Sequence, residues 1–262
     1  CFDVGIAEEH AVTFSGGLAK EGLIPFCNIY SSFMQRAFDE VIHDIAIQKL
    51  HVVFCLDRAG IVGEDGMTHH GSLDMAYLRC IPNMVISAPM NEHYLRHLMF
   101  TAAETNCPFA IRYPRGSGNI LEWKCSPQIL DIGKGRQICD GKDVAILSIG
   151  TIGNVALDAI EKAKSKGINV ALFDMIFVKP IDTDILDYVA QNYKKVITVE
   201  DGTIKGGFGS AVSEYMVMNG YKSKIKMIGI PDEFVTHGKP SELYELCKMD
   251  SDSIYNAIIN EW

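Results

Sequence analysis

Apolar and polar residues alternate along the first half of the chain in a pattern that predicts strands separated by helices. Apolar residues recur at helical spacing from Phe33 to Ala46, and an amphipathic stretch runs from Asn91 to Glu104 behind a proline. Strand–helix alternation of this kind indicates a parallel sheet with helices on both faces. The apolar runs expected to form the strands are residues 2–6, 24–29, 52–56, 84–87 and 109–113.

The pattern breaks between Pro114 and about Leu130 and then resumes as a second, smaller alternating block. A chain of 262 residues is long enough to divide into two domains. We therefore predict an α/β fold of two domains, each a mostly parallel sheet with helices on both faces. The predicted divisions are a first domain over residues 1–116, a linker over 117–135 and a second domain over 136–262. The second block should contain strands at 143–150, 169–175, 194–201 and 225–230, and helices at 154–164, 182–191, 210–218 and 251–260.

Charge and composition narrow the classes of partner. The formal net charge of −9 disfavours a nucleic-acid partner. The chain has no apolar run of the roughly 18–20 residues that a membrane-spanning helix needs, so we expect no membrane partner. The cysteines are dispersed and form no C-x-x-C pair, which is typical of reduced thiols in a cytosolic-type compartment. Because the chain opens with Cys1 inside an apolar run, we expect a segment upstream of it and make no prediction about a targeting peptide.

Polar clusters follow several of the predicted strands, where ligands bind in α/β sheets. The clusters are residues 7–10, 29–36, 57–74 and 112–116. The third is rich in glycine and titratable groups, which indicates a site, although a solvated turn or an adventitious metal loop remains an alternative. A zinc site is disfavoured because adjacent histidines point apart and no cysteine follows at ligand spacing. Its charged and imidazole residues include Asp57, Arg58, Glu64, Asp65, His69 and His70.

The other clusters allow both a structural and a functional interpretation. Glu8 and Glu9 open a helix, so one could cap it while the other faces the sheet edge. Arg36 lies one helical turn after Phe33 and can share a face with it near Tyr30, although the two aromatic residues also suit a core.

Two arginines and one glycine-rich run suggest phosphate binding. Arg58 and Arg115 each follow a strand, and together they suit a phosphate group, with surface salt bridges as the alternative. Gly206 to Ser210 precedes a helix and resembles a phosphate cradle, but it lacks a P-loop lysine, so close helix packing is favoured.

Taken together, these motifs resemble the 1-deoxy-D-xylulose-5-phosphate synthase family. The similarity runs in the family's order along the whole chain, and it implies a pyrimidine-binding domain followed by a C-terminal transketolase domain. The motifs that carry it are FDVGIAEEHAVTF, IYSSFMQRAFDEVIHD, DRAGIVGEDGMTHHGSLDMAYLRCIPNM, IRYPRG, FVKPID and VEDGTIKGGFGS.

The resemblance implies a thiamine-diphosphate-dependent transferase. It would join pyruvate to D-glyceraldehyde 3-phosphate with loss of carbon dioxide, on the non-mevalonate route to isoprenoid precursors that also feeds thiamine and pyridoxal synthesis. Glu8 would hydrogen-bond the aminopyrimidine ring of the cofactor. Phe33 would stack on that ring, with Tyr30 beside it in the cofactor site.

The same resemblance assigns the substrate contacts. Tyr30, Arg36, Asp65 and His69 would contact the pyruvate-derived group, and His69 is also suited to moving protons. Arg58 and Arg115 would hold the phosphate of the aldehyde substrate.

Some features of the family are not found in this sequence. The family binds the diphosphate and Mg²⁺ with a GDG motif, which this chain lacks, so those ligands are expected in an N-terminal domain and the chain alone is expected to be inactive. A homodimer in the cytoplasm is expected, with a plastid-type compartment left open. The alternatives are a transketolase, a 2-oxoacid dehydrogenase beta subunit, or a non-catalytic dimerisation half.

Overall fold

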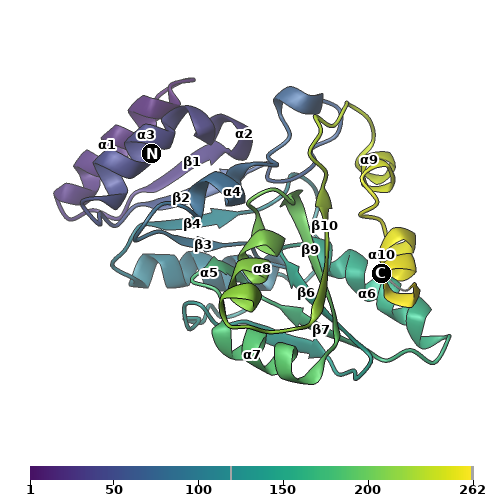
Figure 1. Cartoon of the computed structure of the whole chain (residues 1–262). Helices are drawn as coiled ribbons and strands as arrows, with labels where there is room; N and C mark the ends of the chain where they lie inside the picture. The colour runs from purple at the N-terminus through teal and green to yellow at the C-terminus, as the bar shows by residue number, and fades with distance from the viewer. Residues whose placement is uncertain (119, 261–262) are drawn as a thin grey trace.

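A computed structural model describes residues 1–118 and 120–260 and contains two five-stranded sheets (Figure 1). In the first sheet, four strands run parallel and the fifth, β8, pairs antiparallel with β3. Neighbouring strands are closely in register, with Tyr30 opposite Asp57 and Leu56 opposite Arg112. The strands in spatial order are β1 (Phe26–Tyr30), β2 (Val53–Asp57), β4 (Phe109–Arg112), β3 (Val85–Ser87) and β8 (Phe177–Lys179).

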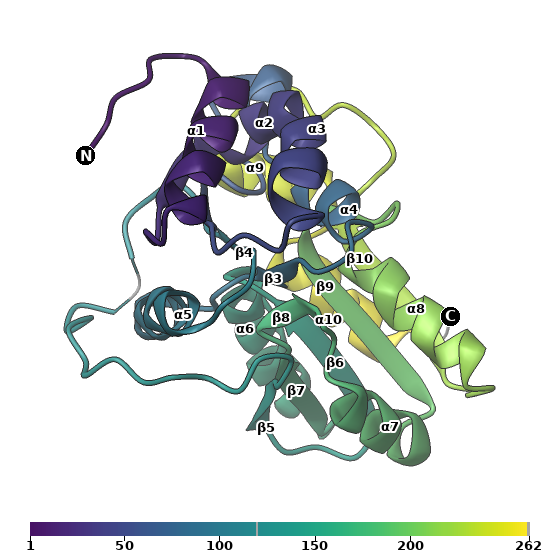
Figure 2. The same ribbon diagram turned by 90° about the vertical axis from the view of Figure 1, so that its left-hand side faces the viewer.

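Helices cover both faces of the first sheet because its strands are apolar on both sides (Figure 2). Phe54 and Leu56 of β2 face α1 (Glu8–Lys20) and the helical segment that follows β1. Val53 and Cys55 point to the opposite face, where α5 (Glu92–Glu104) packs with Leu98 and Ala102. The segment after β1 is one helical run of four parts: α2 (Ser31–Met34), a 3₁₀ turn (Gln35–Ala37), α3 (Phe38–Glu40) and a π-helix (Val41–Ala46).

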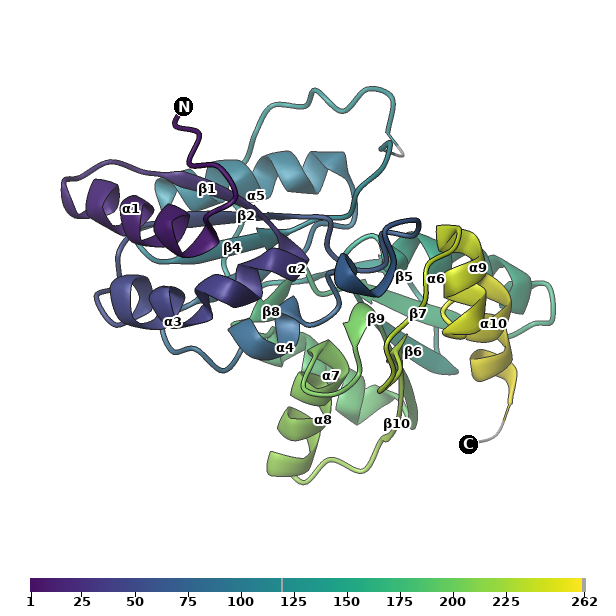
Figure 3. The same cartoon turned by 90° about the horizontal axis from the view of Figure 1, so that it is seen from above.

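The second sheet has the same plan, with four parallel strands and one antiparallel edge strand, β5. Helices α6 (Ile152–Lys164), α9 (Pro240–Leu246) and α10 (Ser251–Ile259) pack on one face. Helices α7 (Thr183–Asn192) and α8 (Phe208–Met218) pack on the other (Figure 3). The strands in spatial order are β10 (Lys224–Ile230), β9 (Lys195–Thr203), β6 (Val144–Ile149), β7 (Val170–Asp174) and β5 (Arg136–Cys139).

The two sheets share one strand connection and one core. The chain passes directly from β7 in the second sheet to β8 in the first, through a turn in which Ile176 has a φ of 56°. Phe177 of β8 is fully buried, and its ring lies edge-on to that of Phe109, with centroids 6.3 Å apart. A second buried cluster contains Met75 in α4 (Asp74–Leu78) and Phe208 in α8. The second half of the chain therefore completes the first sheet.

The predicted fold class is confirmed, with several local corrections. Residues 2–6 do not form a strand, because no strand among the described residues lies beside them to pair with, and Phe2 and Ile6 are exposed. Strands β5 and β8 and helices α4 and α9 were not predicted. The predicted linker 117–135 contains residue 119, and the predicted second domain ends with residues 261–262, all of which lie outside the described residues. Within the described part of the chain, no helix is both long and apolar enough to span a bilayer.

Replacing Phe177 with alanine should test whether β8 stabilises the first sheet. We expect Phe177→Ala to lower the free energy of unfolding by about 3–5 kcal/mol, because it empties a fully buried ring site between two elements. Urea unfolding followed by circular dichroism measures this. Phe234→Ala is the matched control, since Phe234 is 85% exposed and its loss should change stability by less than about 0.5 kcal/mol. Equal effects in the two variants would contradict a structural role for β8.

Candidate active site

The carboxyl ends of three neighbouring strands meet at one edge of the first sheet. Tyr30 ends β1, Asp57 ends β2 and Arg112 ends β4. Arg58 follows β2 directly, with a φ of 59° that is unusual for a residue with a side chain. All of the residues predicted to form a site lie on these strand ends or on the segments that follow them, except Glu8, which opens α1.

Glu8 is a buried carboxylate beside an exposed arginine. Its side chain is only 9% exposed, whereas that of Arg36 is 53% exposed. Nη1 of Arg36 lies 3.3 and 3.4 Å from the two carboxylate oxygens of Glu8. The helix begins after Ala7, which provides no side-chain cap, and Glu9 is exposed to solvent. Glu8 therefore pairs with Arg36 and keeps its carboxylate at the sheet edge, while Arg36 retains free N–H groups at the surface.

Aromatic rings and guanidinium groups stack in a row beside Glu8. The rings of Tyr30 and Phe33 are nearly parallel, with centroids 5.6 Å apart, and His69 meets Phe33 edge-on at 5.2 Å. The guanidinium carbon of Arg58 lies 3.6 Å from the Tyr30 centroid, and that of Arg36 lies 5.2 Å from the Phe33 centroid. We call this row of three rings the aromatic wall; a guanidinium group lies against Tyr30 and another against Phe33.

A hollow of about 260 Å³ lies against this wall. Glu8, Tyr30 and Phe33 line it, together with Ala11, Asn28 and residues 4–7. One buried carboxylate, apolar surfaces and a flat aromatic ring are the features that hold a small planar ring with a polar edge.

The loop from Arg58 to Leu73 brings Asp65 and His69 to the same edge. The Asp65 carboxylate lies 3.4 Å from Nη1 of Arg115, and both side chains are about half exposed. Nδ1 of His69 is 2.9 Å from the Thr68 hydroxyl, which orients the ring toward Phe33. Arg58 is paired with Asp57 at 2.5 Å. Both predicted phosphate-binding arginines therefore stand at this edge, each partly neutralised by an aspartate.

His70 points away from His69, as expected for adjacent histidines. It is buried, its Nδ1 accepts the Val62 N–H, and its Nε2 lies 3.1 Å from the Thr236 carbonyl oxygen.

A buried ion pair between Asp74 and Arg112, which the sequence pattern did not indicate, lies behind the site. Nε of Arg112 is 2.8 Å from Oδ2 of Asp74, which also accepts the Ser31 hydroxyl at 2.9 Å. Burial lowers the pKa of Arg112, but the charge and hydrogen bond of Asp74, with Asp201 and Glu200, outweigh it, so the pKa is raised overall. An arginine inside the apolar run 109–113 was the available signal, because a buried guanidinium requires a carboxylate partner.

The glycine-rich run before α8 does not form a phosphate cradle. The backbone N–H groups of Phe208 and Gly209 donate to the Glu200 carboxylate at 2.7 and 2.8 Å, so a side chain of the protein already occupies the helix N-terminus. A side chain at Gly207 would collide with Glu200, and one at Gly209 would collide with Thr198 and Met227. The glycines therefore serve close packing.

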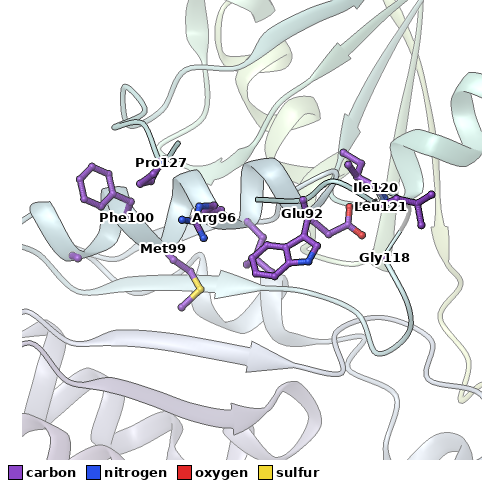
Figure 4. A pocket seen from close by; sticks show the side chains of 11 residues that line it. Glu92, Arg96, Met99, Phe100, Gly118, Ile120, Leu121 and Pro127 are labelled. Carbon is purple, nitrogen blue, oxygen red and sulfur yellow. Dashed lines mark hydrogen bonds between the residues drawn. The ribbon is translucent and has the colours of Figure 1, made fainter. Parts of the chain in front are cut away.

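A larger hollow, of about 830 Å³, lies away from the residues predicted to form the site (Figure 4). It is formed by α5, with Leu95, Met99 and Phe100, and by the segment that crosses the helix, with Leu121 and Trp123. None of the predicted site residues lines it.

Comparison with known proteins identifies the family. Residues 1–119 match the model of the transketolase pyrimidine binding domain, and residues 133–254 match that of the transketolase C-terminal domain. A solved structure described as a split gene transketolase, inactive beta4 tetramer, superposes with a TM-score of 0.88 at 30% identity, covering 98% of this chain and 82% of that one. The chain belongs to the transketolase family.

Within the transketolase family, curated relatives indicate a branch. The chain is 59% identical to the 1-deoxy-D-xylulose-5-phosphate synthase of Azobacteroides pseudotrichonymphae, over 99% of this chain and 42% of that protein. It is also 59% identical to that of Bacteroides fragilis, over 98% of this chain and 40% of that protein. It thus spans about two fifths of these relatives. The transketolase of Campylobacter jejuni shares the fold, with a TM-score of 0.78 at 16% identity over 99% of this chain and 39% of that one.

Glu200 should make the stability of this transketolase-family chain depend on pH. Burial raises the pKa of Glu200 from its ordinary value of 4.5 to about 7, even though hydrogen bonds from Gly209 and Phe208 act against the rise. Between these two values the folded state holds a proton that the unfolded state has released. The contribution of Glu200 to the free energy of unfolding therefore falls as pH rises from about 4.5 to about 7, by at most ~1.4 kcal/mol per pH unit.

Urea unfolding of the wild type and of Glu200→Gln at several pH values between 5 and 7 measures this contribution. The free energy of unfolding of the wild type minus that of Glu200→Gln should fall as pH rises, because glutamine does not titrate. Glu161→Gln, at an exposed side chain, should run parallel to the wild type. A constant difference for Glu200→Gln would show that Glu200 does not titrate in this range.

Proposed function

We propose that this chain forms the pyrimidine-binding and C-terminal domains of a 1-deoxy-D-xylulose-5-phosphate synthase, which condenses pyruvate with D-glyceraldehyde 3-phosphate and releases carbon dioxide. The observation that carries the proposal is the buried Glu8 carboxylate beside Phe33 and Tyr30 in one hollow. The similarity to curated synthases over nearly the whole chain supports the choice of reaction. Because the chain spans about two fifths of those proteins, the proposed activity is that of the complete enzyme.

The hollow fits the aminopyrimidine part of thiamine diphosphate. Phe33 offers a flat face to the ring, and Glu8 offers the one buried charge, to a ring nitrogen. When bound, thiamine diphosphate would supply the nucleophilic carbon that attacks the keto group of pyruvate. The role proposed for Glu8 is to accept a hydrogen bond from the edge of the ring, so that proton transfer at the ring is positioned by a carboxylate.

The described residues do not fit Mg²⁺ in the same way. In the ranges 1–118 and 120–260, no group of three or more histidine, cysteine, aspartate or glutamate side chains is placed to hold a metal ion. We therefore propose that the Mg²⁺ and diphosphate ligands come from the rest of the complete enzyme.

The positive groups of the site suit the two anionic substrates. Arg36 reaches the wall from one side and has free donors for the pyruvate carboxylate. The same pyruvate-derived group would also contact Tyr30, Asp65 and His69. Arg58 and Arg115 would bind the phosphate of the aldehyde, each exchanging part of its contact with an aspartate for the more highly charged phosphate oxygens.

We also propose that the complete enzyme is a cytoplasmic homodimer. Strand β1 leaves one edge of the first sheet open, and the apolar side chains of Leu23, Ile24 and Phe26 are exposed along it. The split gene transketolase with the same fold is described as a tetramer of its beta chain. Both observations support burial of this edge in an assembly.

The role of Glu8 is tested by replacing it with glutamine in the complete enzyme. Glu8→Gln should lower carbon dioxide release from labelled pyruvate roughly 10²- to 10⁴-fold, because the side chain can no longer share a proton with the cofactor ring. Glu9→Gln changes the adjacent exposed carboxylate and should keep wild-type activity. Wild-type release should need thiamine diphosphate and the aldehyde phosphate. If ketose phosphates reacted and pyruvate did not, the enzyme would instead be a transketolase.

The phosphate assignment is tested by Arg115→Met, measured by steady-state kinetics of the complete enzyme. We expect the KM for D-glyceraldehyde 3-phosphate to rise roughly tenfold or more, since a charge-assisted hydrogen bond is worth about 1.5–3 kcal/mol. The KM for pyruvate should stay within about twofold. Arg96→Met, on α5 and outside this cluster, is the control. A rise in the KM for pyruvate alone would show that Arg115 contacts pyruvate and not the aldehyde phosphate.

A further inference from the structure

The loop that carries Asp65 and His69 contains neither a strand nor an α-helix. Its ends are joined by two backbone hydrogen bonds of 2.8 Å, between Gly60 and Gly71. Between these ends it contains one short 3₁₀ turn (Gly66–Thr68), and Asp65 and His69 flank that turn. A loop of this length without a sheet or helix partner needs tertiary contacts to hold one conformation.

The first such contact comes from Asp201, in strand β9 of the second sheet. Oδ1 of Asp201 accepts the Ile61 N–H at 3.1 Å, and Oδ2 accepts the Tyr244 hydroxyl at 2.7 Å. The side chain is buried, and a Cβ at Gly60 would lie 2.0 Å from Oδ2, so only glycine fits beside it. The Asp201 carbonyl oxygen also accepts Nη2 of Arg112 at 2.8 Å. One residue of the second half thus fixes the start of the loop.

The second contact is His70, at the other end of the loop. A backbone N–H can only donate, so the Nδ1 that accepts from Val62 carries no proton. A carbonyl oxygen can only accept, so Nε2 carries the proton and donates to Thr236. The neutral ring therefore closes the loop on itself at Val62 and, through Thr236 alone, ties it to the segment after β10. Gly238 donates to the Gly63 carbonyl oxygen in the same region, at 3.3 Å.

We infer that Asp201 and His70 are positioning residues, through which the second half of the chain holds the loop with Asp65 and His69 facing the site. Neither touches the hollow that contains Glu8. The inference rests on the proposed function for the roles of Asp65 and His69, but the anchoring itself is independent of any reaction. A general domain contact would stabilise the chain without setting the loop conformation, so the test must separate these two effects.

Hydrogen exchange of the amides of Ile61 and Val62, measured on this chain, tests the anchoring directly. Asp201→Ala and His70→Phe should each accelerate exchange in the loop roughly tenfold, because each removes the acceptor of one of these amides. Asp201→Asn and His70→Gln keep an acceptor oxygen and should restore most of the protection. Glu214→Gln breaks the ion pair between Arg79, the residue after α4, and α8, and so controls for loss of a contact between the halves elsewhere.

Tyr244→Phe provides a second variant if Asp201→Ala does not fold, since it removes only one of the two hydrogen bonds to Asp201. It should accelerate exchange at Ile61 less than the alanine variant does. Unchanged loop exchange in folded Tyr244→Phe and His70→Phe, or equal acceleration in Glu214→Gln, would overturn the inference.

Kinetics of the complete enzyme separate this inference from the proposed function. Displacement of Asp65 and His69 should lower kcat/KM for pyruvate roughly 10- to 100-fold in His70→Phe, with recovery in His70→Gln. If the loop loosens but the wild type does not decarboxylate pyruvate, the anchoring stands and the proposed function fails. If pyruvate turnover is normal while the loop is loosened, the positioning role fails and the proposed function stands.

Discussion

The buried ion pair between Arg112 and Asp74 is the interaction on which the site depends. The Arg112 side chain is 5% exposed and that of Asp74 is fully buried, so each charge has lost its water and relies on the other. Arg112 also donates to the carbonyl oxygens of Gly71 and Asp201, and Asp74 also accepts from Ser31. Breaking such a pair leaves an uncompensated charge and costs about 3–5 kcal/mol.

The pair joins elements that are far apart in sequence. It links the end of β4, the start of α2, β9 of the second sheet and the end of the loop that carries Asp65 and His69. The row of rings from Arg58 to His69 rests on the same elements, since Tyr30 precedes Ser31 and His69 precedes the loop end at Gly71. Arg36 and Arg115 can be half exposed and loosely paired because the ion pair behind them is buried and well bonded.

Most regular elements could be predicted from local pattern because they are apolar on their own. Strands such as β2 and β6 are buried on both faces and read as continuous apolar runs. The edge strands β5 and β8 could not be found this way: they have four and three residues, and a distant strand supplies their pairing. The segment 2–6 was wrongly predicted for the opposite reason, because it has strand composition but no neighbour.

The site residues were likewise predictable where a local pattern marks them and not where distant contacts do. Position after a strand indicated the arginines and the titratable loop, and the family resemblance indicated the roles of Glu8, Phe33 and His69. Asp201 could not be identified, because its contact with Ile61 spans 140 residues and no local pattern encodes it.

The crossing from β7 to β8 also constrains how the protein is assembled. During synthesis the first sheet has its other four strands once residue 112 has emerged, but the edge of β3 stays open until residues 177–179 are made. Core residues of the second sheet, in β6 and β7, are translated in between. The two halves are therefore interlocked parts of one folding unit. Expressing residues 1–116 apart from the rest would leave them with an unpaired strand edge at β3 and an unfilled aromatic site beside Phe109.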